Sequence, residues 1–432
     1  MGALWSYINR YSILPLCGSG NYKAGCTDLM ITDSNDGDTG VFMRLYYPVD
    51  KGGEADTEAV SDHPLWIDRA EYVDGLASYM KQTPGRLHFF LNWIVGEIRM
   101  ACVWNRKLAD HRHVLSSHQR IKESFPLVIF SHGLSGCRHF YSTYCSSLAS
   151  YGFVVAAVEH RCATSFVPLF SSNIILTYCL FSDYSACWTY KLIPDSVSGC
   201  FKERCFPIHL IDHNDKRMFK TRNQQLNKRV SECVKALHVL EEINLGQLQN
   251  DKIAIGNDFD WSLFRGRLDL SRAFIAGHSF GGATSIAATA FSTDFQAAVV
   301  LDGWLLPLDS GHYERASQPT LFLNAGNWQT MENIERMNKC RNITEKLFYT
   351  LRDAEHQTFT DFAFLVNPFI GRRMKLHGGT PPTSTMEAIV NMTVSYLNRD
   401  QNVKNGIELV HQKYREFVIN GIPSTLMTKN VQ

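Results

Sequence analysis

The sequence predicts an α/β fold in which a mostly parallel central sheet is flanked by helices. Short apolar runs with the length and composition of buried strands alternate with helix-like stretches, a pattern that is typical of parallel sheets. The clearest example is the run 127–130, followed by a helix-like stretch at 139–150 and a second run at 153–158. A chain of 432 residues with 45% hydrophobic composition can bury a full core, and we expect one domain over residues 1–432.

The other expected elements follow the same alternation. Before the first parallel strand, the sequence favours a strand at 41–47 that Pro48 stops. Residues 162–220 combine an irregular apolar piece with cysteines and mixed charge, and we expect them to be an insertion. A long amphipathic helix is then expected at about 222–245. A strand, a helix and three further strands are expected at 273–276, 281–289, 297–301, 320–323 and 346–351.

The composition argues against nucleic acid as a partner and against a structural metal. The 43 Lys and Arg residues against 42 Asp and Glu residues give a net charge of +1, so no basic excess attracts a polyanion. The twelve cysteines form no CxxC pair and no Cys/His cluster with zinc spacing. We expect reduced, mostly buried thiols, and a local disulfide in one crowded segment is the alternative. The cysteines of that segment are Cys162, Cys179, Cys187, Cys200 and Cys205.

The beginning of the chain resembles a lipid-modified anchor rather than a signal peptide. Arg10 and Pro15 interrupt any apolar run, and no stretch of about 18 apolar residues indicates a spanning helix. The first six residues fit the N-myristoylation pattern, with Gly2 as the acceptor and Ser6 at the required position. We therefore expect an anchor segment at 1–20, and a chance match to a short pattern is the alternative.

Residues 277–281, Gly-His-Ser-Phe-Gly, fit G-x-S-x-G, the nucleophile elbow of α/β-hydrolase folds. The elbow places a serine on a strained turn between a strand and a helix, and small flanking residues let the chain make this turn. Here an apolar strand is expected before the motif and a helix rich in small residues after it. We therefore expect an α/β-hydrolase fold with Ser279 as its nucleophile; a glycine-rich turn with a solvated serine is the alternative.

A serine nucleophile needs a base, and the base needs an acid that orients it. In this fold the order along the chain is serine, acid, histidine. Asp302 is the first carboxylate at a strand end after Ser279, and the next strand, at 320–323, has no carboxylate at its tip. Asp302 is therefore preferred over Asp309 and Glu332; a turn-forming role is the alternative for Asp302.

His356 is the expected base, because it comes after the acid and directly follows the strand at 346–351. His312 comes too early, in the loop just after the acid. His377 lies beyond a helix-like stretch and has no strand before it. A solvent-exposed histidine without a catalytic role is the alternative for His356.

The oxyanion of the tetrahedral intermediate needs two backbone N–H donors. One is expected from Phe280, the residue after the nucleophile, and the other from the turn after an earlier strand. Residues 131–134, Ser-His-Gly-Leu, directly follow the apolar run 127–130, and we assign the second donor to the amide of Leu134. An ordinary strand-end turn is the alternative.

Together, five stretches of the sequence resemble the platelet-activating factor acetylhydrolase family. This family comprises the plasma form, which is the lipoprotein-associated phospholipase A2, and the type II intracellular form. The matching stretches occur in the family's order and extend over most of residues 25–400. They are 130–134, 152–161, 277–284, 301–307 and 356–362.

The resemblance implies a calcium-independent phospholipase A2. Such an enzyme removes the acetyl group of platelet-activating factor, or another short or oxidised acyl chain, from the sn-2 position of a phospholipid. The family's nucleophile, acid and base fall on Ser279, Asp302 and His356, and its oxyanion donors fall on Leu134 and Phe280. Water is the second substrate, and this chemistry needs no metal and no organic cofactor.

The sequence departs from the family near the expected mouth of the pocket. Ser135 stands where the family usually has a glycine after His-Gly-Leu, and Cys162 stands where it usually has an aspartate after Glu-His-Arg. The segment 162–220 is also longer and richer in cysteine than the family's segment. These departures leave the acyl-chain preference open.

Two apolar regions resemble the interfacial helices of the family. Trp93, Ile94 and Val95 lie in the first region, and Phe369 and Ile370 lie in the second. Tryptophan and bulky aliphatic side chains suit a membrane interface. An ordinary buried helix face is the alternative.

The pattern at Gly2 resembles the myristoylated type II form, which implies a cytoplasmic protein that associates peripherally with membranes. Two other functions remain open. A general carboxylesterase or lipase on small soluble esters is the nearest alternative. A catalytically inactive hydrolase fold that serves for binding is the second.

Overall fold

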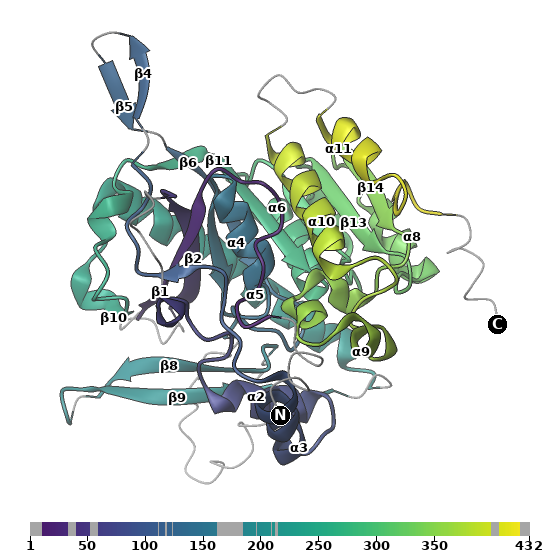
Figure 1. Ribbon diagram of the computed structural model, residues 1–432, viewed down its shortest axis with the longest axis horizontal. Coiled ribbons are helices and arrows are strands. Elements are labelled where there is room, and N and C mark those ends of the chain that lie inside the picture. Colours follow the sequence, from purple (N-terminus) through teal and green to yellow (C-terminus); the bar gives the residue numbers. More distant parts are fainter. Residues whose placement is uncertain are drawn as a thin grey trace.

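A mixed sheet runs through the centre of the protein in the computed structural model (Figure 1). Eleven strands of the described part of the chain belong to it. Neighbouring strands in its middle are parallel, and antiparallel strands border them on both sides. The structure describes residues 11–32, 40–51, 59–110, 112–116, 119–122, 124–161, 185–195, 197–208, 210–211, 215–398 and 406–423, without the side chains of residues 94, 112–116 and 119–122.

The parallel part of the sheet has the strand order β7, β6, β11, β12, β13, β14. Each of these strands contains or overlaps an apolar run predicted from the sequence, so the predicted α/β class is confirmed. The strands are β7 (Val154–Val158), β6 (Phe125–Ser131), β11 (Leu268–His278), β12 (Ala298–Leu301), β13 (Thr320–Ala325) and β14 (Lys346–Leu351).

The strands at the two borders extend this sheet. The predicted strand 41–47 continues to Val49, so the prediction that Pro48 stops it was wrong. Pro48 has no N–H to donate, but its carbonyl accepts a hydrogen bond from the Ala109 N–H at 2.9 Å, and the strand still pairs with its neighbour there. The border strands are β1 (Lys23–Ile31), β2 (Val41–Val49), β3 (Val103–Trp104), β10 (Ile253–Ile255) and β15 (Val418–Asn420).

Helices cover both faces of the sheet, because side chains alternate between the faces along each strand. In β6, Val128 and Phe130 join a core cluster that includes residues of α4 and α10. Leu127 and Ile129 join a second cluster that includes residues of α5, α6 and α8. This two-sided burial explains why the parallel strands are apolar throughout. The helices are α4 (Ser142–Ser150), α5 (Met218–Leu245), α6 (Phe280–Phe291), α8 (Met331–Lys339) and α10 (Pro382–Leu397).

Part of the predicted insertion at 162–220 forms a hairpin of two strands, β8 (Trp188–Pro194) and β9 (Phe201–Pro207). Residues 162–184, with Cys162 and Cys179, lie outside the described part of the chain. Within the hairpin region, the thiols of Cys187, Cys200 and Cys205 are free.

The ends of the molecule differ in the elements that they carry (Figure 1). The β4–β5 hairpin projects at the end where β6 begins, so the parallel strands point their carboxyl ends toward α2, α3 and α9. Across the described residues, no helix combines the length and apolar character that crossing a bilayer requires. The remaining elements are η1 (Val60–Asp62), α2 (Ala70–Tyr79), α3 (Pro84–Phe89), η2 (Phe90–Val95), β4 (Arg112–Ser116), β5 (Gln119–Lys122), η4 (Asn250–Lys252), η5 (Trp261–Phe264), α7 (Ser310–Arg315), η6 (His356–Phe359), η7 (Asp361–Phe364), α9 (Pro368–Arg373) and α11 (Gly406–Tyr414).

Candidate active site

Ser279 lies on the turn between β11 and α6, in a strained backbone conformation with a positive φ of 57° and a ψ of −117°. A Cβ atom on Gly277 would lie 2.2 Å from the carbonyl oxygen of Gly281, and one on Gly281 would lie 1.9 Å from the carbonyl oxygen of Ser131. Only glycine fits at both positions, which is why the turn needs G-x-S-x-G. Ser279 is 8% exposed, so its side chain is largely covered but reaches the surface of the site.

Asp302 and His356 are joined by a hydrogen bond of 2.6 Å between Oδ2 and Nδ1. Asp302 follows β12, the strand next to β11, and His356 follows β14. The second carboxylate oxygen of Asp302 accepts bonds from the Ala325 N–H at 2.8 Å and from the Gln329 side chain at 2.6 Å. An ionised carboxylate, which only accepts, satisfies all three bonds. With Nδ1–H donated to Asp302, Nε2 of His356 is left to accept a proton.

Two rings hold the imidazole of His356. Trp328 stacks on it, with ring centroids 3.8 Å apart and planes 17° apart. The ring centroid of His278 lies 4.4 Å away, and His278 Nε2 is 3.1 Å from the carbonyl oxygen of His356. The side chain of His356 is 17% exposed, so solvent and small ligands can reach it.

The alternative acids and bases have other partners. Asp309 caps α7, where it accepts the His312 N–H at 3.0 Å and pairs with His312 Nδ1 at 2.7 Å. Glu332 pairs with Arg336, and His377 Nδ1 lies 2.9 Å from the carbonyl oxygen of its neighbour in sequence. The structure therefore does not bring these groups to Asp302 and His356.

The predicted oxyanion donors flank the same turn. Leu134 lies in the loop after β6, and Phe280 is the first residue of α6. A Cβ atom on Gly133 would lie 3.3 Å from Cβ of Ser279, so the loop runs directly beside the elbow. For the N–H groups of Leu134 and Phe280, the described residues offer no hydrogen-bond acceptor. Both groups are therefore available as donors, and their role as an oxyanion hole stays a prediction.

A chain of hydrogen bonds links this loop to His356. The Gly133 N–H donates to the Tyr141 hydroxyl at 3.0 Å, and this hydroxyl lies 2.9 Å from Nδ1 of His278. Nε2 of His278 completes the chain at the His356 carbonyl. Burial, together with the nearby His356, lowers the pKa of His278 well below its ordinary value. In neutral His278, Nδ1 accepts a hydrogen bond from the Tyr141 hydroxyl and Nε2–H donates one to the His356 carbonyl, so each bond has a donor and an acceptor.

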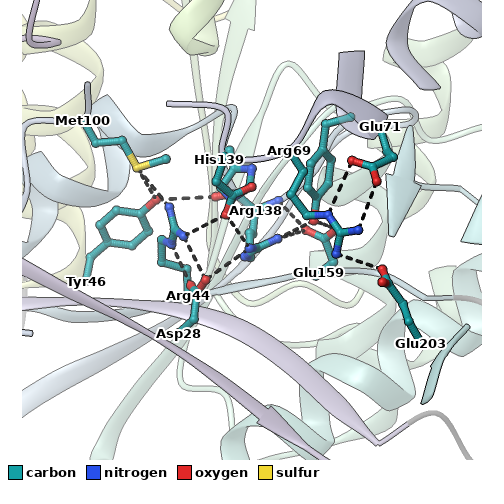
Figure 2. A network of polar contacts seen from close by, with 12 residues as sticks. Asp28, Arg44, Tyr46, Arg69, Glu71, Met100, Arg138, His139, Glu159 and Glu203 are labelled. Atoms are coloured by element: carbon teal, nitrogen blue, oxygen red, sulfur yellow. Dashed lines mark hydrogen bonds and ion pairs between the residues drawn. The ribbon is translucent and has the colours of Figure 1, made fainter. Parts of the chain in front are cut away.

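Beyond Leu134, the loop is anchored by Arg138 (Figure 2). Its guanidinium bonds Asp28 at 3.1 Å and Asp68 at 3.3 Å, and it lies 3.4 Å from Glu159. Arg44 binds both carboxylate oxygens of Asp28, at 2.7 and 2.8 Å. Burial alone would raise the pKa of Asp28, but the charges of Arg138 and Arg44 together hold it well below its ordinary range. The loop is thus tied to β1, to the segment before α2 and to the end of β7, and through Asp28 it is linked to Arg44 of β2.

One group of potential metal ligands exists within the described residues: His278, Asp302 and His356, whose ligand atoms lie within 4.8 Å of one another. Asp302 Oδ2 already bonds His356 Nδ1, and the two ring nitrogens of His278 lie at hydrogen-bond distance from the Tyr141 hydroxyl and from the His356 carbonyl oxygen. The prediction that the site needs neither metal nor cofactor stays a prediction.

Sequence reasoning missed four residues of this site: Tyr141, His278, Trp328 and Gln329. His278 occupies the first variable position of G-x-S-x-G, so only its place beside the nucleophile marked it. The others lie on loops far from the triad in sequence and carry no motif.

Trp93 and Phe369 are 68% and 73% exposed, as a membrane interface requires. Phe89, which was not predicted, is 59% exposed and stacks with Trp93, with ring centroids 6.3 Å apart. Ile370 is half-buried and packs against the core.

Val95 does not fit the interface, because it is 2% exposed and belongs to the core cluster. Its assignment to a membrane contact was therefore wrong. The side chain of Ile94 and the whole of Gly2 lie outside the described part of the chain.

Comparisons with known proteins agree with this geometry. The model of the family described as platelet-activating factor acetylhydrolase, isoform II, matches residues 9–413. The chain is 31% identical over 400 residues to the platelet-activating factor acetylhydrolase of Canis lupus familiaris, with 92% of this chain and 80% of that protein covered. It is 31% identical over 401 residues to the protein of the same name from Gallus gallus, with 90% and 84% covered.

More distant similarities point to the same fold. A putative phospholipase A2 of Schizosaccharomyces pombe is 23% identical over 408 residues, with 84% of each chain covered. Among solved structures, a ferulic acid esterase from Streptomyces cinnamoneus superposes with a TM-score of 0.55 and 18% identity, covering 90% of this chain and 92% of the esterase. At this identity the likeness concerns the fold alone, and it confirms the predicted α/β-hydrolase architecture.

Proposed function

This chain belongs to the platelet-activating factor acetylhydrolase, isoform II, family, and we propose that it is a calcium-independent serine phospholipase A2. Its proposed substrates are platelet-activating factor and related phospholipids that carry an acetyl, short or oxidised acyl chain at sn-2. The observation that carries the proposal is the 2.6 Å bond between Asp302 and His356. Asp302 follows β12, the strand next to the elbow of Ser279, and His356 follows β14 in the same sheet.

In the proposed mechanism, Ser279 Oγ attacks the carbonyl carbon of the sn-2 ester while His356 Nε2 takes the hydroxyl proton. Asp302 holds the imidazole in the required tautomer and stabilises the imidazolium. The N–H groups of Leu134 and Phe280 bind the oxyanion. When the intermediate collapses, the C–O bond to the lysophospholipid breaks and His356 gives the proton to the leaving oxygen.

Deacylation repeats these steps with water. His356 takes a proton from a water molecule, the hydroxide attacks the acyl-Ser279 ester, and the second intermediate releases the carboxylic acid. The proton returns to Ser279 Oγ, and the free enzyme is restored. Since side chains and backbone amides supply every group, the proposed reaction needs no calcium.

Ser279→Ala tests the nucleophile. We expect kcat to fall roughly 10⁴-fold or more, because alanine lacks the hydroxyl oxygen on which the proposed acyl intermediate forms. The variant should also lose labelling by a fluorophosphonate while keeping its circular-dichroism spectrum and thermal midpoint. A folded variant with a near-normal rate would show that another residue is the nucleophile, and a wild type that never labels would favour a binding-only fold.

The acyl-chain preference separates the proposed phospholipase from a general carboxylesterase. Rates would be measured on phospholipids with sn-2 chains of increasing length and on a small soluble acyl ester, each with and without EDTA. The proposal expects the short-chain phospholipids to be preferred and EDTA to have no effect. Preference for the soluble ester would favour the alternative function.

We further propose that the protein is cytoplasmic and binds membranes peripherally. The exposed rings of Phe89, Trp93 and Phe369 support this, because exposed aromatic side chains insert favourably into the headgroup region. A myristoyl chain on Gly2 would be the second anchor, since one such chain alone gives only marginal, reversible binding.

A further inference from the structure

A buried arginine of α5 contacts the loop that carries the first proposed oxyanion donor. Arg229 is fully buried, and one of its guanidinium nitrogens donates to the carbonyl of His132. A second guanidinium nitrogen lies 3.2 Å from the carbonyl oxygen of Gly133, and Nε donates to the Ser185 hydroxyl at 2.8 Å. One side chain thus binds two successive carbonyl groups directly before Leu134.

Other groups besides Arg229 also contact the Gly133 carbonyl oxygen. It accepts the Gly136 N–H at 3.1 Å and lies 2.8 Å from His132 Nδ1. The described chain contains no cis peptide bond, and in a trans peptide the C=O and the following N–H point in opposite directions. Holding the Gly133 carbonyl toward Arg229 therefore turns the Leu134 N–H to the opposite side. Rotation of this peptide would break these bonds and remove the donor.

The same guanidinium contacts the second donor residue. It lies over the ring of Phe280, with the central carbon 4.4 Å from the ring centroid, and this ring is fully buried. Arg229 is therefore in contact with the peptide group that carries the Leu134 N–H, through the Gly133 carbonyl, and with the ring of Phe280. The two proposed donors come from different elements of the fold.

The helix that carries Arg229 is fixed to the strand ends by a neighbouring side chain. Glu232, one turn further along α5, accepts the Arg161 N–H at 3.0 Å and lies 2.8 Å from His160 Nδ1. His160 Nε2 in turn lies 2.8 Å from the hydroxyl of Ser131, the last residue of β6. This second set of buried contacts fixes the distance between α5 and the loop, so the guanidinium has little freedom to move.

We propose that Arg229 is a positioning residue for the oxyanion hole. It orients the peptide between Gly133 and Leu134 and supports the ring of Phe280, so that both N–H groups face one oxygen atom. The inference rests on the proposed esterase function of Ser279. Arg229 does not touch the substrate; it acts through the two donors.

The test compares an oxygen ester with the matching thionoester, in which sulfur replaces the carbonyl oxygen. Sulfur is a weak hydrogen-bond acceptor, so well-placed oxyanion donors accelerate the oxygen ester much more than the thionoester. We expect Arg229→Met to lower kcat for the oxygen ester by about 10- to 100-fold, less than the loss of a whole donor. KM should change little, and the ratio of oxygen-ester to thionoester rate should fall with kcat.

Arg267→Met is the matched control. Arg267 is also buried, donates to the Ala109 carbonyl at 2.7 Å and lies over the ring of Phe125, but it precedes β11 at the opposite end of the sheet. Its loss should lower stability and leave the rate ratio unchanged. If Arg229→Met lost stability but showed the same ratio of oxygen-ester to thionoester rate as Arg267→Met, Arg229 would be a structural residue only. The proposal would then be overturned.

Arg229→Lys decides the question if the methionine variant does not fold. A single ammonium group cannot bind the same set of groups as a planar guanidinium, so the ratio should still fall several-fold. A wild-type ratio in this variant would overturn the proposal. If wild-type protein hydrolysed neither ester, or if Ser279→Ala kept the activity, the proposed function itself would fail; an active wild type with an unaffected Arg229 variant refutes the positioning role alone.

Discussion

Asp302 is held after β12 in a left-handed backbone conformation, with a φ of 44°. Aspartate and asparagine visit this region more readily than most residues, because their short side chains bond locally. The carboxylate itself bonds His356, Ala325 and Gln329. Asparagine can therefore replace Asp302 without new backbone strain, and the substitution tests the chemistry separately from the fold.

We expect Asp302→Asn to lower kcat on the order of 10⁴-fold, because an amide no longer selects the tautomer with the proton on His356 Nδ1. The measurement is steady-state hydrolysis of a soluble ester, with the thermal midpoint as a check of folding. Asp309→Asn is the control, since Asp309 caps a helix. If the control were damaging and Asp302→Asn harmless, the acid would be Asp309.

The proposed triad could be predicted because each residue carries a local signal: the elbow motif for Ser279 and a strand end for Asp302 and His356. The residues that support the triad could not. Gln329 bonds Asp302 across 27 positions of sequence, and Trp328 stacks on His356 only because β13 and β14 are neighbours. Contacts between loops depend on the strand order, which no short pattern encodes.

At the level of elements, the region from α3 to η2 presents two stacked aromatic rings to solvent while one face packs on the core. The sequence predicted an apolar, interface-like segment here, and of its two exposed rings it named Trp93 but not Phe89. Phe89 was missed, and Val95 was placed on the wrong side. Val95 was assigned through the resemblance to an interfacial helix, which marks the segment but not the direction of each side chain. In the structure, η2 is a π-helical turn, in which the Gly96 N–H bonds the Leu91 carbonyl at 2.8 Å, and Val95 belongs to the core cluster.

We expect a Phe89→Ser/Trp93→Ser double variant to weaken binding to phospholipid vesicles at least about tenfold, because two exposed rings no longer enter the interface. Hydrolysis of vesicle lipid should fall with binding, whereas the rate on a soluble ester and the thermal midpoint should stay nearly unchanged. Gly2→Ala should also release protein from membranes. The readouts are vesicle sedimentation and the two rates.

Val95→Ser is the matched control within the same turn. Val95 is buried, so this variant should lose stability without a specific effect on vesicle binding. If the double variant instead lost stability and both activities together, Phe89 and Trp93 would be core residues, and the acyl chain would remain as the only proposed anchor.

On the scale of the whole molecule, the carboxyl edge of the sheet contains buried histidines that the fold keeps neutral. Burial, together with the nearby Arg229 and His160, lowers the pKa of His132 well below its ordinary value. The hydrogen bonds agree with this shift. His132 Nε2 accepts the backbone N–H of His160 at 3.2 Å and therefore cannot carry a proton. In mild acid, His132 thus binds a proton in the unfolded chain but not in the folded protein.

This difference in proton binding predicts a loss of stability in mild acid. The pKa of His132 in the folded protein is below the unfolded value of about 6.5. The unfolding free energy is therefore unaffected by this histidine above that pH, and it decreases as the pH falls below it, because only the unfolded chain binds the proton. Between pH 7 and 5.5, His132→Gln should lose about 1 kcal/mol less unfolding free energy than the wild type. Urea unfolding at both pH values gives the difference, and equal losses would contradict the prediction.

The comparison of variants is needed because other groups titrate nearby in the opposite direction. Burial raises the pKa of Glu232 and of Asp361, so protonation of these carboxyls favours the folded state as the pH falls. The pH dependence of the wild-type unfolding free energy therefore combines contributions that rise and contributions that fall as the pH decreases. Taking the difference with His132→Gln isolates one histidine.

Strands of the fold could be predicted from the sequence where their buried residues are apolar. They could not be predicted where a strand buries a charged residue that pairs with an opposite charge elsewhere in the fold. The parallel strands are apolar runs, and their alternation with helices gave the class. β1 was missed because Asp28 interrupts its apolar character; the residue is buried only because Arg44 on β2 and Arg138 bind it. A strand of this kind can be recognised only together with its partners.

The chain of hydrogen bonds from Gly133 through Tyr141 and His278 to the carbonyl of His356 has a consequence for the energetics of catalysis. Every donor in it points the same way along the chain, so the dipoles add and strengthen one another. The loop of the proposed oxyanion donor and the proposed base are therefore already oriented relative to each other before a substrate arrives. In the proposed reaction, these dipoles do not have to reorient when charge develops on the substrate. The reorganisation energy of the site is therefore low.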